Sequence, residues 1–360
     1  MKNSLLVLLI YQSNMMKRLV TICFMLVVLV ANAQKPKVWV ISDGGDGIND
    51  PDDISAIASY LLMSNLFDTR AIVMASTVHA WNKETSDQGI WASEFFGKAY
   101  SSDLPNLKKH IGGYQSDFRF IESSIKGQGN NFDPKEDVNL KDYPSILALY
   151  KEVKKSKEII NVLCWGPLTE QALFVKYCLD QNKHNVLSKV RFISHWSSSN
   201  YHTGTMENPE LTHNCVGDPI ACDYMKVQAL NGLIKFYECG AIGQFGIVEN
   251  AQKGSDYYDQ FKASHLGKIF AEGKFKKERV DDSDCATYWV LIGDYGVSLD
   301  DLAGNGLNMP EVEKRNEEAF ASHAELIRHE ILRRSNAAAG KVDAIESDYY
   351  IAPRGRIERK

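Results

Sequence analysis

The chain has 360 residues, of which 44% are hydrophobic, and a formal net charge of −5 at pH 7. This length and composition suffice for a buried core, and no long Pro/Ser linker, low-complexity tract or internal repeat divides the chain into further domains. Its 41 Lys and Arg residues are spread thinly, which argues against nucleic acid polymers and membrane surfaces as partners of the mature protein.

A secretory signal peptide is predicted at residues 1–33. The basic pair Lys17-Arg18 precedes an apolar run at residues 19–30, and small residues lead to a cleavage site after Ala33. The run is too short for a membrane anchor, which needs roughly 20 residues. The mature protein is therefore expected to be secreted or periplasmic.

The same segment bears on where the chain starts. Met15 and Met16 stand directly before the basic pair, so either is an alternative to Met1 as the true start. Cleavage would leave residues 34–360, which we expect to form a single α/β domain with a helical C-terminal extension. A homo-oligomer is compatible with this composition, and the sequence leaves the oligomeric state open.

Apolar runs typical of strands alternate with helix-like segments in the mature chain. Strands are expected at residues 38–42, 70–75, 159–165, 190–195 and 234–238, and helices at 52–64, 146–154, 168–178, 219–230 and 311–334. This alternation predicts an open, mostly parallel twisted sheet with helices on both faces. Ligands of such folds bind beyond the carboxyl ends of the strands, whereas the charged last helix is expected to pack at the periphery.

Three junctions between strand and helix carry a proline where the helix is expected to begin, at Pro51, Pro167 and Pro219. Proline suits the first helical position because its missing N–H would have no partner there, and an aspartate before it is a good N-cap. This pattern places Asp52 and Asp53 in the first turn of a helix.

Six of the seven cysteines remain after removal of residues 1–33, an even number that permits disulfides in an exported protein. They lie mainly in apolar strand-like or helix-like segments, and no Cys-x-x-Cys pair suggests zinc. We therefore expect buried thiols at Cys164, Cys178, Cys215, Cys222, Cys239 and Cys285.

The most informative segment is residues 38–53, a buried strand followed by a turn with three glycines and five aspartates. Carboxylates at close range raise one another's pKa, and a helix dipole offsets at most about 1 kcal/mol per carboxylate. A divalent cation is the natural compensation, and oxygen ligands without Cys or His favour calcium before magnesium. The alternatives are a solvated Asp/Gly turn that only caps the helix and a phosphate-binding loop, which the carboxylates and the missing Lys disfavour.

At this turn the sequence resembles the nucleoside hydrolases, which carry an Asp-rich turn ending in Asp-Asp at a helix start after their first strand. It is most similar to the nucleoside hydrolase-like domain of secreted bacterial proteins described as cellulose-binding. Their turn reads Asn-Glu-Pro-Asp-Asp, where residues 49–53 read Asn-Asp-Pro-Asp-Asp. Residues 64–68, SNLFD, also resemble this subgroup.

Two further segments resemble the family in the expected order. Residues 161–172, NVLCWGPLTEQA, are similar to the family's strand followed by Gly-Pro-Leu-Thr. The resemblance implies that Trp165, before the glycine, gives its backbone carbonyl to calcium. Residues 213–219 are similar to the family's Asn-x-x-x-Asp-Pro segment, which implies that Asn214 binds sugar hydroxyls and makes the adjacent His213 a further candidate contact.

A last match lies at residues 282–289, which resemble the family's late Asp at a helix start. Asp284 aligns best with the aspartate that closes the calcium site, and Asp282 is the second candidate near the substrate. The matches together span residues 38–289 and imply the α/β fold of the nucleoside hydrolases.

In that family calcium holds two sugar hydroxyls and a water, and a carboxylate takes a proton from the water as it attacks the anomeric carbon. The resemblance implies that Asp52 is the base, while Asp53, Asp284 and the Trp165 carbonyl hold the metal.

The family has a further calcium ligand in the Asp-rich turn. Its position in this chain is left open between two residues, because the turn here is three residues longer than usual. Asp46 and Asn49 are the candidates, and Asp43 at the strand end would orient them or contact the substrate.

Two departures concern the leaving group. The family's sugar-binding Glu is Thr212 here, and Ser283 stands where purine-acting members have His. His79 is a candidate to replace a family asparagine or act as an acid, and Trp81 could stack on a base or sugar ring; the plain alternative for each histidine is a loop or core residue.

The resulting prediction is a calcium-dependent hydrolase of a glycosidic bond, N-ribosyl or related, in a sugar-containing small molecule or glycan fragment. The alternative is a non-catalytic, calcium-dependent carbohydrate-binding protein of the same fold. Asp52 favours catalysis, because a pure binder needs no base beside the metal carboxylates.

Overall fold

The computed structural model describes residues 35–47, 52–77, 87–125, 131–203, 213–341, 349–351 and 357–359. Contacts divide the chain into Met1–Lys35 and a second unit, Pro36–Lys360, and only the second is described below. The predicted signal peptide at residues 1–33 lies outside the described residues. Among the helices that the structure does describe, none has both the length and the apolar character needed to cross a membrane.

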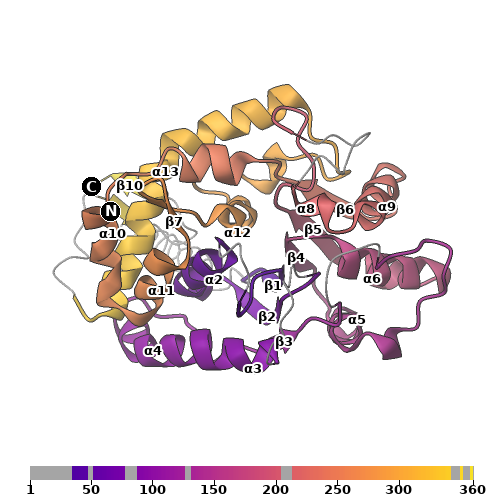
Figure 1. Cartoon of the computed structure of the whole chain (residues 1–360), viewed down its shortest axis with the longest axis horizontal. Coiled ribbons are helices and arrows are strands. Elements are labelled where there is room, and N and C mark those ends of the chain that lie inside the picture. The colour runs from indigo at the N-terminus through magenta and orange to yellow at the C-terminus, as the bar shows by residue number, and fades with distance from the viewer. Residues whose placement is uncertain are drawn as a thin grey trace, which may run out of the picture. The chain divides into compact units, whose positions relative to one another are not determined.

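A six-stranded parallel sheet forms the centre of this unit (Figure 1). The strands are β1 (Lys37–Ser42), β2 (Asp68–Met74), β3 (Phe120–Glu122), β4 (Ile160–Trp165), β5 (Val190–Ser194) and β6 (Lys235–Glu238). Their order is β3-β2-β1-β4-β5-β6, so the direction of strand addition reverses between β1 and β4. Such a switch point opens a crevice at the carboxyl ends of the two strands, and the register pairs their last residues, Ser42 and Trp165.

Helices cover both faces of the sheet, which confirms the predicted fold class. Alternate residues of β1 point to opposite layers: Val38 and Val40 join the core that contains α2, α4, α11, α12 and α13, whereas Trp39 and Ile41 join the core beneath α5, α6 and α9. Figure 1 shows these two helix layers on either side of the strands. Strands buried on both faces explain the continuous apolar runs in the sequence.

Helices complete the unit, and those at residues 88–110 and 255–273 were not predicted from the sequence. The helices are α2 (Asp52–Met63), α3 (Gln88–Ala92), η2 (Ser93–Gly97), α4 (Lys98–His110), α5 (Pro144–Lys155), α6 (Thr169–Asp180), α7 (His184–Leu187), α8 (His213–Val216), α9 (Pro219–Leu230), η5 (Ile242–Val248), α10 (Ser255–Asp259), α11 (His265–Gly273), η7 (Ser283–Cys285), α12 (Ala286–Ile292) and α13 (Pro310–Ala338). Two hairpins add β7 (Phe275–Lys276) with β8 (Arg279–Val280), and β9 (Tyr349–Ile351) with β10 (Ile357–Arg359).

Two of the predicted helix starts can be compared with the structure. Asp218 caps α9 by accepting from the Ala221 N–H, with Pro219 in the first turn. Pro167, however, lies two residues before α6, and Leu168 is the N-cap. The proline ring packs against the turn between α8 and α9, because a Cβ on Gly217 would lie 2.6 Å from Pro167 Cγ. Pro51 lies outside the described residues.

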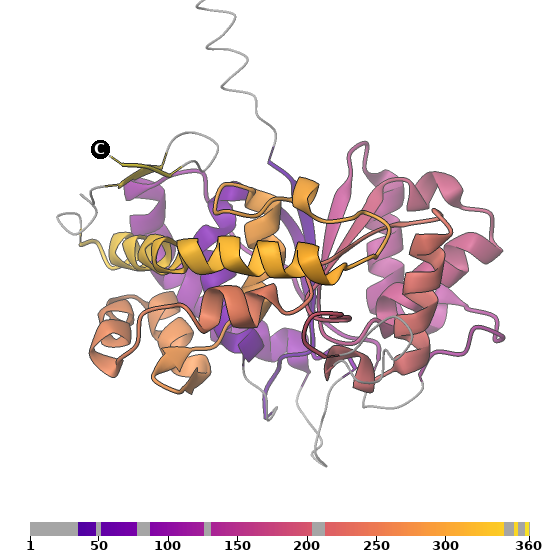
Figure 2. The same cartoon turned by 90° about the horizontal axis from the view of Figure 1, so that it is seen from above.

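The last helix is less peripheral than predicted. Figure 2 shows α13 extended across one side of the unit, and it packs along η5. Arg328 and Arg334 of this helix are both among the largest fully buried side chains. The prediction was wrong because the buried charges of α13 have partners, Asp282 for Arg328 and Glu330 for Arg334, so an abundance of charged residues does not mark a solvent-exposed helix.

The cysteine prediction is correct for four thiols and wrong for two. Cys164, Cys178, Cys239 and Cys285 are free and buried. Cys215 and Cys222 form a disulfide between α8 and α9, with Cα atoms 5.7 Å apart. The chain turns between these helices, and this brings the two side chains into bonding range.

Candidate metal centre at the carboxyl edge of the sheet

Three aspartates meet where β1 and β4 end. Asp52 and Asp53 come from the first turn of α2, and Asp284 comes from η7. Each offers a carboxylate oxygen, and these atoms all lie within 4.8 Å of one another. Asp53 and Asp284 are each only 2% exposed, whereas Asp52 is partly exposed, so two carboxylates of this acidic triad are largely removed from water.

The end of β1 holds Asp53 in place. Ser42 Oγ donates to Asp53 Oδ1 at 2.5 Å and itself accepts from the Gly44 N–H at 3.1 Å. A Cβ on Gly44 would lie 2.3 Å from Asp53 Cβ. The glycine is therefore required by the close approach of the turn to the carboxylate, independently of its backbone angles.

The end of β4 is tied to the segment that carries Asp284. Trp165 Nε1 donates to Thr287 Oγ1 at 2.6 Å, and this hydroxyl donates to the Asp284 carbonyl at 2.8 Å. The next residue, Gly166, leaves room for Asp43, whose Oδ2 would lie 2.6 Å from a Cβ at that position. Asp43 and Trp165 thus lie at the same edge as the triad.

The carboxylates at this edge affect one another. Burial is the main cause that raises the pKa of Asp284 well above its usual range, and the charges of Asp53, Asp52, Asp43 and Asp281 raise it further. A buried group of like charges is unfavourable without a cation. Its oxygen-only donors fit a hard divalent ion such as calcium.

One lysine partly offsets this charge. Lys274 Nζ lies 3.3 Å from Asp52 Oδ2 and 3.1 Å from Asp281 Oδ2. Sequence reasoning missed both Lys274 and Asp281. Asp281 directly precedes the segment at residues 282–289 and could have been included, whereas no motif marks Lys274, which reaches the site only through packing of α11 against α2.

Asp282 does not join the triad, although it lies two residues from Asp284. Its carboxylate is fully buried and accepts from Arg328, with Nη2 to Oδ1 at 2.6 Å and Nη1 to Oδ2 at 2.9 Å. Ser59 Oγ donates to Asp282 Oδ2 at 3.3 Å. The structure therefore places Asp282 in a buried ion pair with Arg328.

The remaining predicted residues lie in several places. Asp46 is exposed, and its backbone N–H donates to Gln88 Oε1 at 2.7 Å. Asn214 Nδ2 donates to the His195 carbonyl at 2.8 Å, just after β5. His213 begins α8, and its side chain is outside the described atoms. The predicted residues Asn49, His79 and Trp81 lie outside the described part of the chain.

Unusual backbone conformations occur at the same edge of the sheet. Ala75 follows β2 with φ 62°, and Trp196 follows β5 with φ 43°. Non-glycine residues rarely adopt this left-handed region, and they persist where packing and function demand it. Ala75 N donates to the Gly44 carbonyl and Trp196 N to the Gly240 carbonyl, so both residues fix the loops around the crevice.

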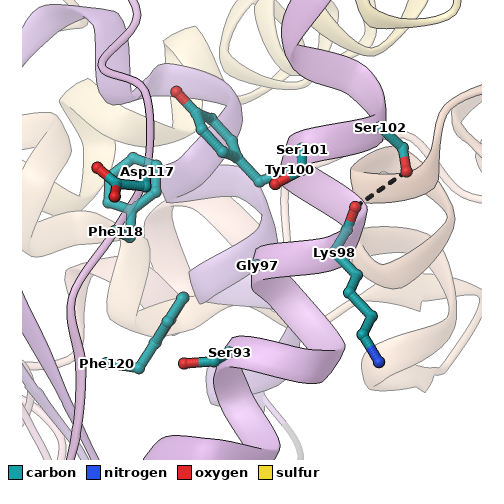
Figure 3. Close-up of a pocket in the computed structure, with 9 residues that line it drawn as sticks. All are labelled: Ser93, Gly97, Lys98, Tyr100, Ser101, Ser102, Asp117, Phe118 and Phe120. Carbon is teal, nitrogen blue, oxygen red and sulfur yellow. Dashed lines mark hydrogen bonds between the residues drawn. The ribbon is translucent and has the colours of Figure 1, made fainter.

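A separate cavity of about 600 Å³ lies beside η2 and α4 and shares no residue with the triad (Figure 3). Figure 3 shows Lys98 extending away from Phe118 and Phe120, with Ser102 Oγ donating to the Lys98 carbonyl. Ligand sites usually combine apolar walls with convergent polar groups. The charged and aromatic groups of this cavity do not converge, so we assign the functional site to the acidic triad.

The sheet order and the acidic triad at its carboxyl edge define the class of protein, an α/β protein of the nucleoside hydrolase-like fold. The model of the family described as "Cellulose-binding Sde182, nucleoside hydrolase-like domain" matches residues 37–314. The chain belongs to this family, which confirms the resemblance noted in the sequence. No curated protein matches the chain.

Solved structures of similar fold include a nucleoside hydrolase-related hypothetical protein from Saccharophagus degradans that is associated with carbohydrate metabolism. It is 17% identical, with 90% of this chain and 77% of that chain covered and a TM-score of 0.57. This likeness supports the fold alone.

Two nucleoside hydrolases are more distant. The inosine-uridine preferring enzyme from Bacillus anthracis is 15% identical over 70% of this chain and 80% of its own, with a TM-score of 0.39. The purine-preferring enzyme from Gardnerella vaginalis is 12% identical over 81% and 99%, with a TM-score of 0.42. TM-scores this low do not indicate a shared activity.

Proposed function

We propose that the protein is a calcium-dependent hydrolase of a glycosidic bond, N-ribosyl or related, in a sugar-containing substrate. The observation that carries this proposal is the convergence of Asp52, Asp53 and Asp284 within 4.8 Å at the switch point of the sheet. Asp53, Asp284 and the Trp165 carbonyl would hold the ion, and Asp46 and Asn49 remain the candidates for the other early ligand. When bound, calcium supplies charge compensation and a Lewis acid.

Asp52 is the proposed general base. The Asp53 N–H donates to Asp52 Oδ1 at 3.2 Å, and Lys274 Nζ lies 3.3 Å from the other oxygen. These two contacts orient the carboxylate at the edge of the triad. The Asp52 side chain is 19% exposed. A partly exposed carboxylate can take a proton from a water that attacks an anomeric carbon.

The sugar would lie in the crevice next to this base. Asn214, fixed by its contact with the His195 carbonyl, is the proposed ligand of the sugar hydroxyls. The predicted signal peptide supports a secreted or periplasmic location, where glycan fragments and scavenged small molecules are the available substrates.

A second candidate function is calcium-dependent carbohydrate binding without turnover. The description of the family as cellulose-binding favours it. The two functions differ at Asp52, because a binding protein needs the ion and its ligands but no base.

The test combines calcium titration and hydrolysis in the same samples. Chelator-treated mature protein is titrated with calcium by calorimetry, beside Asp53→Asn, Asp52→Asn and the control Asp256→Asn, an exposed aspartate in the first turn of α10. Hydrolysis of a panel of nucleosides and aryl glycosides is then measured, and circular dichroism verifies the fold of each variant.

Calcium binding by wild type and Asp256→Asn, lost in Asp53→Asn, would support the metal centre. Turnover that falls about 10²–10⁴-fold in Asp52→Asn, with calcium binding retained, would support the base. Calcium binding without turnover of any panel member would favour the binding protein. Failure of the wild type to bind calcium would overturn the proposal.

A further inference from the structure

A second cavity adjoins the acidic triad. It has a volume of about 520 Å³ and lies between η5 and the β7–β8 hairpin. Lys274 and Asp281 line it, and the same Lys274 reaches Asp52 at 3.3 Å. Lys274 therefore links the cavity to the triad.

Positive charge dominates the walls of this cavity. Lys274, Lys276, Lys277 and Arg279 line it, against two carboxylates. One of these, Asp281, already accepts the ammonium of Lys274 at 3.1 Å. The hairpin cations thus outnumber the carboxylates, directly beside a triad of the opposite charge.

The hairpin that carries these cations is anchored to the segment at residues 251–254. Its turn residues Lys277 and Glu278 have φ of 50° and 62°, as a tight two-residue turn requires. The Gly254 N–H donates to the Glu278 carbonyl at 2.9 Å, and Arg279 Nε donates to the Ala251 carbonyl at 2.9 Å. Asp281 N donates to the Lys274 carbonyl at 2.8 Å and closes the hairpin. The cations are therefore presented by a fixed element.

Trp196 completes the cavity from the carboxyl end of β5. Its indole packs edge-on against Phe245, with ring centroids 5.7 Å apart. Its Nε1 is buried and has no hydrogen-bond partner among the described residues. A buried donor of this kind is costly unless a ligand oxygen accepts from it.

We propose that this cavity binds an anionic substituent, a phosphate, sulfate or carboxylate, on the sugar-containing substrate cleaved at the triad; the substrate assignment rests on the proposed function. The acidic triad would repel such a group, so an anionic substrate needs a separate, cation-lined place beside it. Charge-assisted hydrogen bonds from Lys and Arg recognise these oxyanions. A volume of about 520 Å³ also lies within the range of small-molecule sites.

The first measurement is independent of turnover. Binding of inorganic phosphate, sulfate and glucuronate is measured by calorimetry at constant ionic strength for wild type, Lys276→Gln/Lys277→Gln and Lys108→Gln/Lys109→Gln. The last variant removes the same charge from an exposed lysine pair at the end of α4. We expect the Kd of at least one anion to rise about tenfold or more in the hairpin variant, a loss of about 1.4 kcal/mol, and to stay unchanged in the control.

The second measurement compares kcat/KM for a nucleoside and its 5′-monophosphate, and for an aryl glucoside with its 6-sulfate and the aryl glucuronide. The ratio of anionic to neutral substrate should fall in the hairpin variant only, and the preferred member identifies the substituent. Equal anion affinity in all three proteins, including none in the wild type, would overturn the proposal, as would an equal loss in the control. Anion binding that depends on the hairpin, without turnover of any substrate, would reject the hydrolase function and leave the anion site standing.

Discussion

At the acidic site, single residues determine how closely the backbone can approach the aspartates. Gly44 and Gly166 are required because a Cβ at either position would collide with a neighbouring aspartate. The sequence identified Asp52 and Asp53 correctly as first-turn residues of a helix, because the Asp-Pro-Asp-Asp pattern is local. It did not identify Lys274, since nothing within its own segment marks a residue whose partner lies more than two hundred positions earlier.

Ser42 is expected to act as a positioning residue for calcium. In Ser42→Ala the 2.5 Å contact to Asp53 Oδ1 is lost, so the carboxylate is less well oriented toward an ion. We expect calcium affinity to fall about 10-fold or more, as measured by calorimetry. Ser64→Ala removes a buried hydroxyl that donates to the Leu61 carbonyl and should leave calcium affinity unchanged; equal affinities in both variants would contradict this role.

The buried carboxylate of Glu238 should make the stability of the protein depend on pH. Burial raises the pKa of Glu238 to about 7 and lowers the pKa of Lys226 to about 8. Ser197 joins them, because its N–H and Oγ donate to Glu238 while its carbonyl accepts from Lys226 Nζ.

The sign follows from proton binding in the two states. Between the ordinary value of 4.5 and about 7, the folded protein keeps a proton on Glu238 that the unfolded chain has released. The free energy of unfolding therefore falls as pH rises through this window. We expect wild type to lose about 2 kcal/mol more than Glu238→Gln/Lys226→Met between pH 5 and 7, measured by urea denaturation; parallel pH profiles would refute the shift.

At the scale of elements, the strand-helix units were predictable and the last helix was not. The sequence of β1 is an apolar run, and that of α2 begins with a helix-capping pattern. Because both patterns are local, the place of these elements at the site follows from sequence. The charged composition of α13 gives no sign that its Arg328 is fully buried against Asp282. That pairing also explains why Asp284, and not Asp282, joins the triad.

The Arg328–Asp282 pair is expected to be essential for the packing of α13. Arg328→Met leaves Asp282 buried without its partner, which should cost about 3–5 kcal/mol of unfolding free energy. Adding Asp282→Asn should restore much of this loss, because no isolated charge remains. The control Lys314→Met, on the same helix, removes a lysine that pairs with the exposed Glu318, with side chains 55% and 68% exposed, and should cost less than about 1 kcal/mol. Urea denaturation measures all four proteins, and similar losses in both single variants would contradict the burial argument.

At the scale of the whole molecule, the proposed calcium ligands join distant parts of the chain. Asp53, Trp165 and Asp284 are brought together only when α2, β4 and η7 are packed, so the unfolded chain has no equivalent site. Calcium should therefore stabilise the folded state by mass action.

Calcium at about 100 times its Kd should stabilise the protein by about 2.7 kcal/mol and raise Tm by several degrees. Differential scanning calorimetry with calcium and with chelator measures this shift. Asp256→Asn should keep the shift and Asp53→Asn should lose it. A shift of equal size in Asp53→Asn would place calcium elsewhere on the protein.

The sequence by itself determined the parallel α/β sheet and the helix start at Asp52-Asp53, because periodicity, capping and turn chemistry act over a few neighbouring residues. The family followed from the resemblance of its motifs to those of known proteins. The family resemblance implied that Asp284 joins the site, and the tertiary structure brings it to Asp52 and Asp53. Only the tertiary structure decided that Asp282 pairs with Arg328 and that Lys274 links the triad to a cation-lined cavity. The physical reason is that burial and charge compensation depend on contacts between side chains that are distant in the sequence. A local sequence pattern carries no information about those contacts.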